Sequence, residues 1–591
     1  MLNCKQELLE QYIKEFNLPN NKIIEHTDEN YFDYYDVNSI PKGMGLADSI
    51  VLNDDGTLKY GFLKGHDGEE MTLTVGYTGA GKSQRLVLQE VRVAVQKGHS
   101  AVVTDTSGQL VDYLYGYLKE KGVNVKIINF GNTQKSDRYN PLLLAANECK
   151  ENKCITEYAE IIANDIAKLI VDKDTKDPAW SYGARNFLLG LIYGLFENVA
   201  KGTIEPEDVT LYNLVQQFFW INEKASPKGA NELREIEYYR DVDLNSMSYK
   251  NMVPIIACPD STRACYLSTL YDYMGKINNS IFYDITSSNT LNISDLWEKQ
   301  TVIFINTADK EIGDIISSLF INQLYKESME KSMQTVTKKL PKIIDVFLDE
   351  FANIRVTDDK TFIKMLTTTR KMQIFYHMYI QSYAQLEAKC GDAGGMSTIM
   401  SNCTLIFMGS GDYGSREQFA NNAGKRTIES ISTYCTNEIP QITQQYVLNP
   451  EQLGKLKKGE MYISRQGYDV IHTYFEAAYK CKEFIPEQTY ENLFEDNTYD
   501  YKNNVIIQPL MIKTINPKLV TPSTFNRILG DEGVEEYKFI IENGFYSNFY
   551  EMRKLEKLGV IKRDKDKFIG LIDKCIVEAA SSYSTRRRSF F

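Results

Sequence analysis

The chain has 591 residues, of which 43% are hydrophobic and 25% charged. This composition is typical of a folded globular protein and excludes a chain that is disordered throughout, and at roughly 150 residues per domain the length suggests about four domain-sized units. The 67 Lys and Arg against 79 Asp and Glu give a net charge of −12, which excludes a uniformly basic coat for nucleic acid but leaves room for a local basic channel.

The N-terminal residues predict a short amphipathic helix and an acidic arm. Apolar residues recur at helical spacing within residues 5–16, and an acidic, aromatic stretch follows at 28–36. Charged residues from position 5 onward exclude a signal peptide. We therefore assign residues 1–45 to this helix and arm, and turn signals within residues 47–65 predict a hairpin after them.

Apolar segments that alternate with helical patterns predict a parallel α/β sheet. Residues 109–121 have helical spacing between two strand-like segments, and this order is typical of parallel sheets. The longest apolar run, residues 187–196, is too short to cross a bilayer and is interpreted as part of a core helix. The expected strands are residues 71–75, 100–104, 124–130, 301–306, 343–348, 374–380, 404–408, 460–464 and 469–475.

Residues 143–290 have a different character, because helical spacing prevails there and runs of β-branched residues are few. We predict that they form an all-α domain inserted into the sheet domain. The tail Arg586–Arg588 is basic, and its ordinary interpretation is a solvated chain end, with contact to DNA or acidic lipid as the alternative. The expected domains are the N-terminal arm 1–45, the sheet domain 46–142 and 291–482, the insertion 143–290, an acidic linker 483–504 and a small helical module 505–591.

Residues Gly76–Ser83 fit the pattern G-x-x-x-x-G-K-[ST] at every fixed position. In such a loop the glycines let backbone N–H groups point at phosphate oxygens, Lys82 would neutralise the β- and γ-phosphates of ATP, and Ser83 would ligate Mg²⁺. A predicted strand before the loop and a helix over 84–96 after it provide the required context, and an accidental match is the alternative. The expected nucleotide-binding residues are Gly76, Thr78, Gly79, Ala80, Gly81, Lys82 and Ser83.

Asp349 and Glu350 come directly after the apolar segment 343–348. Hydrolysis of a phosphoanhydride uses one carboxylate to hold Mg²⁺ and another to polarise the attacking water. We expect Asp349 to take the first role and Glu350 the second. The alternative is a solvated pair at the start of the next helix, where acidic residues are favoured. Asp345 interrupts the same apolar run, and the sequence offers no explanation for it.

Arg370 and Gln381 are further candidates. An arginine can stabilise the charge that develops on the γ-phosphoryl group, often across a subunit boundary, and a glutamine at a strand end can hydrogen-bond the γ-phosphate. On their own, both would be interpreted as ordinary surface residues. The histidines form no cluster and are interpreted as structural. They are His26, His66, His99, His377 and His472.

Over about residues 45–480, the ordered set of motifs resembles the type IV coupling protein family, the TraG/TraD-type conjugation ATPases. Residues 103–110 resemble the family's TDPKGEL segment, with Thr-Ser in place of Pro-Lys and Gln in place of Glu. Leu348–Asn353 matches LDEFAN. Thr369–Lys371 matches TRK and Gln381–Leu386 matches QSxxQL, while Tyr139–Leu142 resembles YNPL and Asp177–Trp180 resembles DPFW, with Ala in place of Phe.

This resemblance implies a RecA-like P-loop ATPase domain with an inserted all-α domain, and ATP and Mg²⁺ as cofactors. By the same resemblance, Arg370 is a candidate arginine finger and Gln381 a γ-phosphate sensor. A homo-hexamer would hold single- or double-stranded DNA in a central channel, although the isolated chain could be a monomer. The all-α domain would dock relaxase and relaxosome proteins, and a secretion-channel ATPase or a membrane anchor protein would be a further partner.

The function that the resemblance favours is a DNA-dependent ATPase that delivers a relaxase–DNA or protein substrate to a type IV secretion or conjugation channel. Family members usually carry N-terminal transmembrane helices and this sequence shows none, so we expect a cytoplasmic protein at the periphery of the membrane. Two alternatives stay open. One is an ATP-driven receptor for protein effectors without DNA handling, which the negative charge favours. The other is a soluble DNA translocase of the FtsK/HerA kind, which the LDEFAN and QSxxQL passages disfavour.

Overall fold

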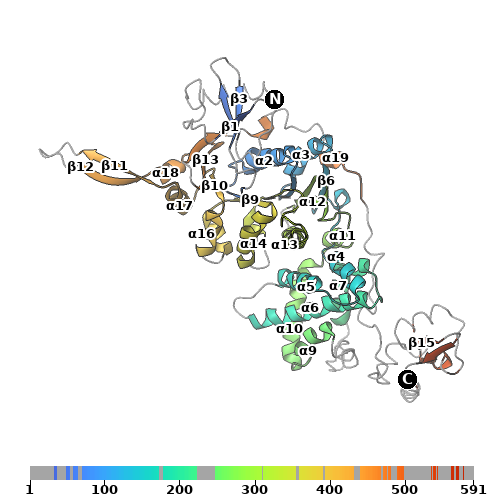
Figure 1. The fold of residues 1–591 in the computed structure, drawn as a ribbon. Helices are drawn as coiled ribbons and strands as arrows, with labels where there is room; N and C mark the ends of the chain where they lie inside the picture. Colours follow the sequence, from blue (N-terminus) through green and yellow to red (C-terminus); the bar gives the residue numbers. More distant parts are fainter. Residues whose placement is uncertain are drawn as a thin grey trace. The chain divides into compact units, whose positions relative to one another are not determined.

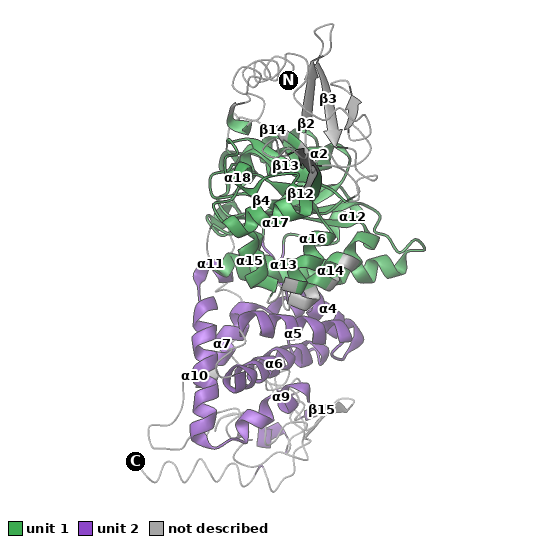
Figure 2. Ribbon diagram, turned by 90° about the vertical axis from the view of Figure 1, so that its left-hand side faces the viewer, with its two compact units in different colours: residues 1–137, 290–498 green, residues 138–289, 499–591 purple. Residues whose placement is uncertain are grey.

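The structure of the chain is a computed structural model (Figure 1). Two compact units make up the chain: unit 1 comprises residues 1–137 and 290–498, and unit 2 comprises residues 138–289 and 499–591 (Figure 2). The expected helix over residues 5–16 and the tail Arg586–Arg588 lie outside the described residues. The structure describes residues 70–171, 178–222, 246–308, 311–354, 359–390, 393–431, 440–466, 470–474, 477–480 and 489–497, with short stretches before residue 64 and within 534–577.

Unit 1 is built on a nine-stranded sheet with the strand order β14-β13-β10-β4-β9-β8-β5-β7-β6. The strands from β10 to β6 in this order are parallel, whereas β13 and β14 are antiparallel at one edge. Each strand expected from the sequence is present. Their bounds are β4 Thr72–Val75, β5 Ser100–Asp105, β6 Asn124–Asn129, β7 Thr301–Asn306, β8 Ile344–Leu348, β9 Ile374–Ile380, β10 Thr404–Phe407, β13 Glu460–Ser464 and β14 Ile471–Tyr474.

Helices cover both faces of this sheet (Figure 1). Every residue of β5, β7, β8 and β9 is buried, which explains why these strands are nearly continuous apolar runs in the sequence. One face packs against α2 (Leu88–Gln96) and α3 (Gln109–Glu120), and the other against α13, α14 and α16. The remaining bounds are α12 Asp295–Glu298, α13 Glu311–Gln334, α14 Asp359–Met372, α15 Tyr383–Cys390, α16 Ala393–Ser401, α17 Tyr413–Ala423, α18 Pro450–Leu453 and α19 Tyr490–Leu493.

Smaller sheets accompany the main one. The hairpin predicted within residues 47–65 is present as the antiparallel pair of β2 (Asp48–Leu52) and β3 (Leu58–Leu63), and β1 (Phe32–Tyr35) pairs with β3 on the other side. A separate antiparallel ribbon is formed by β11 (Lys425–Ile431) and β12 (Pro440–Tyr446).

Unit 2 is largely helical, and its central element is α6 (Pro178–Ala200), which packs against five other helices. Gly190 lets α9 approach closely, because a Cβ atom there would lie 2.3 Å from Met252 Cγ. The apolar run 187–196 lies within α6 and is buried. Among the described residues, no helix is both long and apolar enough to span a membrane. The other helices are α4 Leu143–Asn152, α5 Glu157–Ile170, α7 Leu211–Asn222, α9 Met247–Ile256, α10 Asp260–Ile277 and α11 Ser280–Thr286.

The C-terminal residues of unit 2 include strands. Where the sequence predicts a small helical module over 505–591, the described residues contain β15 (Ile561–Asp564) and β16 (Lys567–Gly570) as an antiparallel pair. The segment KRDKDKF alternates only weakly in hydropathy, so its charged residues give no strand signal in the sequence.

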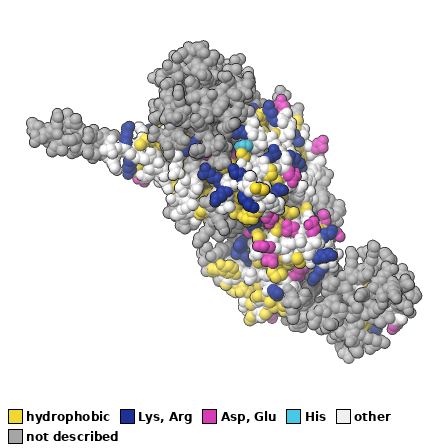
Figure 3. Space-filling view, viewed as in Figure 1, with side chains coloured by type: hydrophobic (Ala, Val, Ile, Leu, Met, Phe, Trp, Pro, Cys, Tyr) yellow, Lys and Arg dark blue, Asp and Glu magenta, His cyan; other side chains and the backbone are white. Residues whose placement is uncertain are grey.

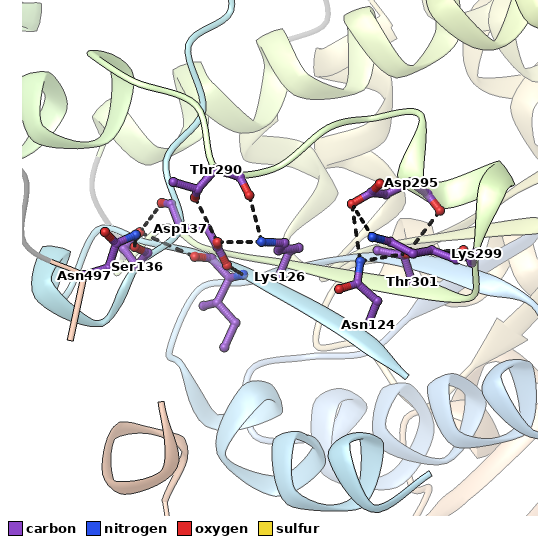
Figure 4. Close-up of polar contacts among 10 residues, drawn as sticks. Asn124, Lys126, Ser136, Asp137, Thr290, Asp295, Lys299, Thr301 and Asn497 are labelled. Atoms are coloured by element: carbon purple, nitrogen blue, oxygen red, sulfur yellow. Dashed lines mark hydrogen bonds and ion pairs between the residues drawn. The ribbon is translucent and has the colours of Figure 1, made fainter. Parts of the chain in front are cut away.

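The chain leaves unit 1 after Asp137 and returns at Thr290, and Lys126 of β6 joins both points (Figure 4). Lys126 Nζ lies 3.0 Å from Asp137 Oδ1 and donates to the Thr290 carbonyl oxygen at 2.7 Å. The Thr290 hydroxyl donates to the same Asp137 oxygen at 2.9 Å. The two ends of the insertion are therefore held side by side at the edge strand of the sheet.

Part of the predicted linker 483–504 packs against unit 1. Tyr490 is 3% exposed, and its ring centroid lies 6.3 Å from that of Tyr115 on α3. The Asn497 amide donates to the Ser136 carbonyl oxygen at 3.2 Å (Figure 4), and Lys135 pairs with Asp496 at 2.9 Å. The acidic, polar composition of this segment predicts a solvated linker. Its aromatic side chain Tyr490 nevertheless attaches it to the core of unit 1.

Candidate nucleotide site

The loop Gly76–Ser83 begins directly after β4 and ends in a π-helical turn, Ser83–Val87, that leads into α2. Gly79 and Gly81 have φ values of 86° and 91°, which L-residues with side chains adopt at a cost. Neighbouring strand ends fix the loop, because Gly76 N–H donates to Ile380 O at 3.0 Å and Tyr77 N–H to Gly409 O at 3.1 Å. The loop therefore stands at the carboxyl edge of the sheet, with Thr78 and Gly79 exposed and Ala80 buried.

Lys82 is buried at the base of this loop, with an exposed fraction of 7%. Its Nζ donates to the Gly76 carbonyl oxygen at 2.7 Å. Burial lowers the pKa of Lys82, and the nearby carboxylates of Glu350 and Asp349 oppose that effect. The ammonium group is thus held inside the loop, where phosphate oxygens would be its natural partners.

Asp349 follows β8, and its Oδ2 accepts a hydrogen bond of 3.0 Å from the Ser83 hydroxyl. Burial raises the pKa of Asp349, whereas the bond from Ser83 acts in the opposite direction. Thr104, at the end of β5, donates to the Asp349 carbonyl oxygen at 3.2 Å and fixes the backbone there. A hydroxyl and a carboxylate oxygen facing each other are the ligand types that Mg²⁺ prefers, and Mg²⁺ commonly takes only one or two protein ligands.

Glu350 is a non-glycine residue with φ 51° and ψ 46°, in the left-handed region. Such strain persists where the surrounding structure fixes it and is frequent at functional sites. Gln381, directly after β9, donates from Nε2 to both Glu350 carboxylate oxygens at 3.2 and 3.1 Å. Because β9 lies between β4 and β8, this glutamine stands between the phosphate loop and the acidic pair.

Arg370 lies apart from these residues. It is exposed in the last turn of α14, four residues before β9 begins at Ile374. Gln381 follows the opposite end of β9, which spans about 23 Å at 3.3 Å per residue. Arg370 is therefore at the amino edge of the sheet, and the structure does not bring it to the loop of its own chain.

Asp105 is a buried acidic residue whose role the sequence does not indicate. Its Oδ1 accepts from Gly108 N–H at 2.9 Å and its Oδ2 from Val111 N–H at 3.1 Å, so it caps the start of α3. Burial raises the pKa of Asp105 to about 6. Thr104 and Asp105 are polar residues that end an apolar strand, and both lie in the segment 103–110 that resembles TDPKGEL, but neither signal indicates their contacts.

The fold is similar to that of solved coupling proteins. A structure described as the plasmid coupling protein TrwB in complex with a non-hydrolysable ATP analogue has a TM-score of 0.50 and 14% identity, with 76% of this chain and 98% of that chain covered. A truncated TrwB in complex with sulphate has a TM-score of 0.50 and 15% identity, with 73% and 88% covered. These likenesses confirm the expected RecA-like α/β fold with an additional helical domain.

A comparison with curated proteins finds no match. The family described as "Type IV secretory system Conjugative DNA transfer" matches residues 29–492, most of the chain. This match covers the loop, the acidic pair and the whole insertion, and it agrees with the resemblance seen in the motifs. The chain therefore belongs to the type IV secretory system conjugative DNA transfer family.

Proposed function

We propose that this chain is an ATP-hydrolysing coupling protein that moves a DNA or relaxase–DNA substrate toward a type IV secretion channel. Family membership supports the coupling role. The hydrolytic role rests on one observation: the phosphate loop with Lys82 and Ser83, the acidic pair Asp349 and Glu350, and Gln381 meet at one edge of the sheet although three separate segments contribute them.

The residues of the loop would bind the phosphates of ATP. Backbone N–H groups of the loop and the start of the π-helical turn Ser83–Val87 offer positive partial charge, and the Lys82 ammonium would turn from the Gly76 carbonyl oxygen to the β- and γ-phosphates. Ser83 and Asp349 would hold Mg²⁺, which neutralises charge on the phosphate oxygens when bound.

Glu350 would orient the attacking water and take up its proton. Its carboxylate is bound by Gln381, so it is already directed toward the end of β9. A γ-phosphate at the loop would compete for the Gln381 amide, and the amide would then release Glu350 toward the water. Gln381 would in this way report the presence of the γ-phosphate to the general base.

Arg370 would act on the site of a neighbouring subunit. Its exposure and its position at the sheet edge opposite the loop support a head-to-tail ring, in which the amino edge of one subunit meets the carboxyl edge of the next. A homo-hexamer is the ring that the family resemblance implies, and the isolated chain could be a monomer until DNA or a membrane partner assembles it.

DNA would be bound through local positive charge. Figure 3 shows Lys and Arg side chains gathered on one face of unit 1, although the net charge of the chain is −12. Unit 2 would dock relaxase and relaxosome proteins, and an anchor protein or channel ATPase would hold the chain at the cytoplasmic face of the membrane. The negative net charge favours a second function, a receptor for protein effectors that does not handle DNA.

ATP hydrolysis by the purified chain, with and without single- or double-stranded DNA, tests these proposals. Glu350→Gln should abolish hydrolysis and retain nucleotide binding, because the amide cannot accept the proton. Stimulation by DNA that weakens steeply with salt would support the DNA motor. Glu350-dependent hydrolysis that ignores DNA would favour the effector receptor, and hydrolysis unaffected by Glu350→Gln would contradict the assigned base.

A further inference from the structure

Asp345, the acidic residue that interrupts the apolar run of β8, is fully buried between two histidines. His99 Nδ1 donates to Asp345 Oδ2 at 2.8 Å, and His377 Nε2 lies 3.5 Å from Asp345 Oδ1. Burial alone would raise the pKa of Asp345, but the contacts with His377 and His99 outweigh it and lower the pKa to about 2. The carboxylate is therefore ionised in the core, which is costly unless donors surround it.

The network continues from His377 to the strand that carries the phosphate loop. The Thr72 hydroxyl, on β4, lies 3.0 Å from His377 Nδ1. His377 Nε2 faces a carboxylate and is assigned the proton, so Nδ1 is the acceptor and Thr72 the donor. Thr72, His377 and Asp345 all have 0% exposure. Because all three are fully buried, their polar atoms depend on neighbouring side chains, which are one another and, for Asp345, also His99. Their burial also excludes a catalytic role of their own.

The three residues lie on three adjacent parallel strands, each four residues before the residue that follows its strand. Thr72 is four residues before Gly76, Asp345 four before Asp349, and His377 four before Gln381. Each interval spans about 13 Å of extended chain. Thr72 and His377 are direct partners in the register of β4 and β9, and Asp345 pairs with Phe375, two residues before His377, in that of β8 and β9.

A change of register would break this network. A slip of one residue between two strands moves a side chain to the other face of the sheet, so it would separate a buried donor from a buried acceptor. Apolar side chains at these positions would pack almost equally well in several registers. A buried polar network favours one arrangement, because another register would separate the Thr72 hydroxyl from His377 Nδ1 and His377 Nε2 from the Asp345 carboxylate.

We propose that Thr72, His377 and Asp345 are positioning residues that fix the relative heights of β4, β9 and β8, so that the phosphate loop, Gln381 and the Asp349–Glu350 pair meet at the carboxyl edge. The kinetic part of this inference rests on the proposed hydrolysis of ATP. A shift of a fraction of an ångström between β8 and β9 would separate Gln381 from Glu350, whereas the loop would keep its own shape. Turnover should depend on the network more strongly than nucleotide binding does.

Thr72→Val tests the network, because valine has the same shape and lacks the hydroxyl. Thr301→Val is a matched control. Thr301 also is the first residue of a parallel strand in this sheet and is fully buried, and its hydroxyl accepts from Asn124 at 3.1 Å (Figure 4). It joins β6 and β7, which carry none of the proposed site residues. Thr72→Ser restores the hydroxyl and serves as the rescue variant.

Each variant is assayed at the same interval below its own melting temperature. We expect Thr72→Val to lower kcat about tenfold with the Kd of a fluorescent ADP analogue within about twofold of wild type, because small displacements of reacting groups cost large factors in rate. Thr72→Ser and Thr301→Val should stay within about twofold of wild type in both quantities. Equal kcat losses in Thr72→Val and Thr301→Val, or no loss in Thr72→Val, would overturn the inference.

Hydrogen exchange decides the question without catalysis. The Gly76 amide is bonded to Ile380 O, so it reports the contact between the ends of β4 and β9. Thr72→Val should accelerate exchange at Gly76 several-fold, and Thr301→Val should not. If wild type hydrolyses no ATP, the proposed enzymatic function fails, and this exchange measurement still confirms or rejects the positioning role.

Discussion

The Gln381 side-chain amide donates to both carboxylate oxygens of Glu350, at 3.2 and 3.1 Å, so the proposed sensor and the proposed base hold each other. The backbone reinforces this arrangement from both sides. Glu350 has a left-handed conformation, and the Gln381 backbone N–H donates to Gln385 Oε1 at 3.1 Å. A γ-phosphate that draws the amide away would change the surroundings of the base directly.

Gln381→Ala should therefore lower kcat by roughly tenfold to a hundredfold, because Glu350 loses the partner that orients it and the γ-phosphate loses a donor. Nucleotide affinity should change little, since the loop residues are untouched. Steady-state hydrolysis and titration with a fluorescent ADP analogue measure the two effects. Gln385→Ala removes only the side-chain oxygen that accepts from the Gln381 backbone N–H, so it should have a smaller effect. A Gln381→Ala variant as active as wild type would contradict the sensor role.

Ser83→Ala should reduce the stimulation of nucleotide binding by Mg²⁺ about tenfold, because the hydroxyl that faces Asp349 is lost. Binding in the presence of a chelator should remain near that of wild type, as the loop amides and Lys82 are unchanged. Titrations with and without Mg²⁺ give the ratio for each variant, and Ser83→Thr, which keeps a hydroxyl, should restore it. A full Mg²⁺ effect in Ser83→Ala would place the ion elsewhere.

The strands and the phosphate loop could be predicted because their signals are local: apolar runs for buried strands and glycines where φ must be positive. The pair Asp349 and Glu350 could be predicted from its place after such a run. The contacts of Thr104 with Asp349 and of Asp345 with His377 could not, because these residues are far apart in the sequence and meet only through the strand order. The strand order depends on how the connecting segments cross the sheet, and the length of a connection does not show beside which strand the next one is placed.

Arg370 illustrates the same point. The sequence places it 11 residues before Gln381 in one short segment, which suggests a shared site. The structure places β9 between them, so they stand at opposite edges of the sheet. Tyr490 shows the converse, since a composition typical of a linker conceals one aromatic side chain that packs into the core.

Asp105 should make the stability of unit 1 depend on pH. Its pKa is raised by burial from 3.8 to about 6, so the folded state favours the protonated form. The stabilisation is fully present below about pH 4 and is lost as the pH rises through 6. In Asp105→Asn the side chain is neutral throughout. Between about pH 4 and pH 6, the unfolding free energy of wild type minus that of the variant should therefore fall by about 3 kcal/mol.

Urea denaturation at several pH values measures this difference. Trp297 is the one tryptophan in the sequence of unit 1, so its fluorescence reports that unit after Trp180 and Trp220 have been changed to Phe. The Asn side chain can keep the bonds that Oδ1 accepts from Ser107 and Gly108 and loses the bond from Val111, which shifts the variant by a constant amount. A difference that does not change with pH would contradict the assignment.

Subunit mixing tests whether Arg370 serves a neighbouring site. Arg370→Ala keeps an intact loop and Lys82→Ala keeps an intact arginine, and each variant alone should hydrolyse little ATP. In mixed rings, about a quarter of the interfaces would join an intact loop to an intact Arg370 if assembly is random and sites act independently. Mixing equal amounts should therefore restore about a quarter of wild-type hydrolysis. Lys371→Ala, the exposed neighbour on the same turn, should retain activity and serves as the control. An arginine that acted on its own chain would give no recovery on mixing, because no subunit would then hold both groups.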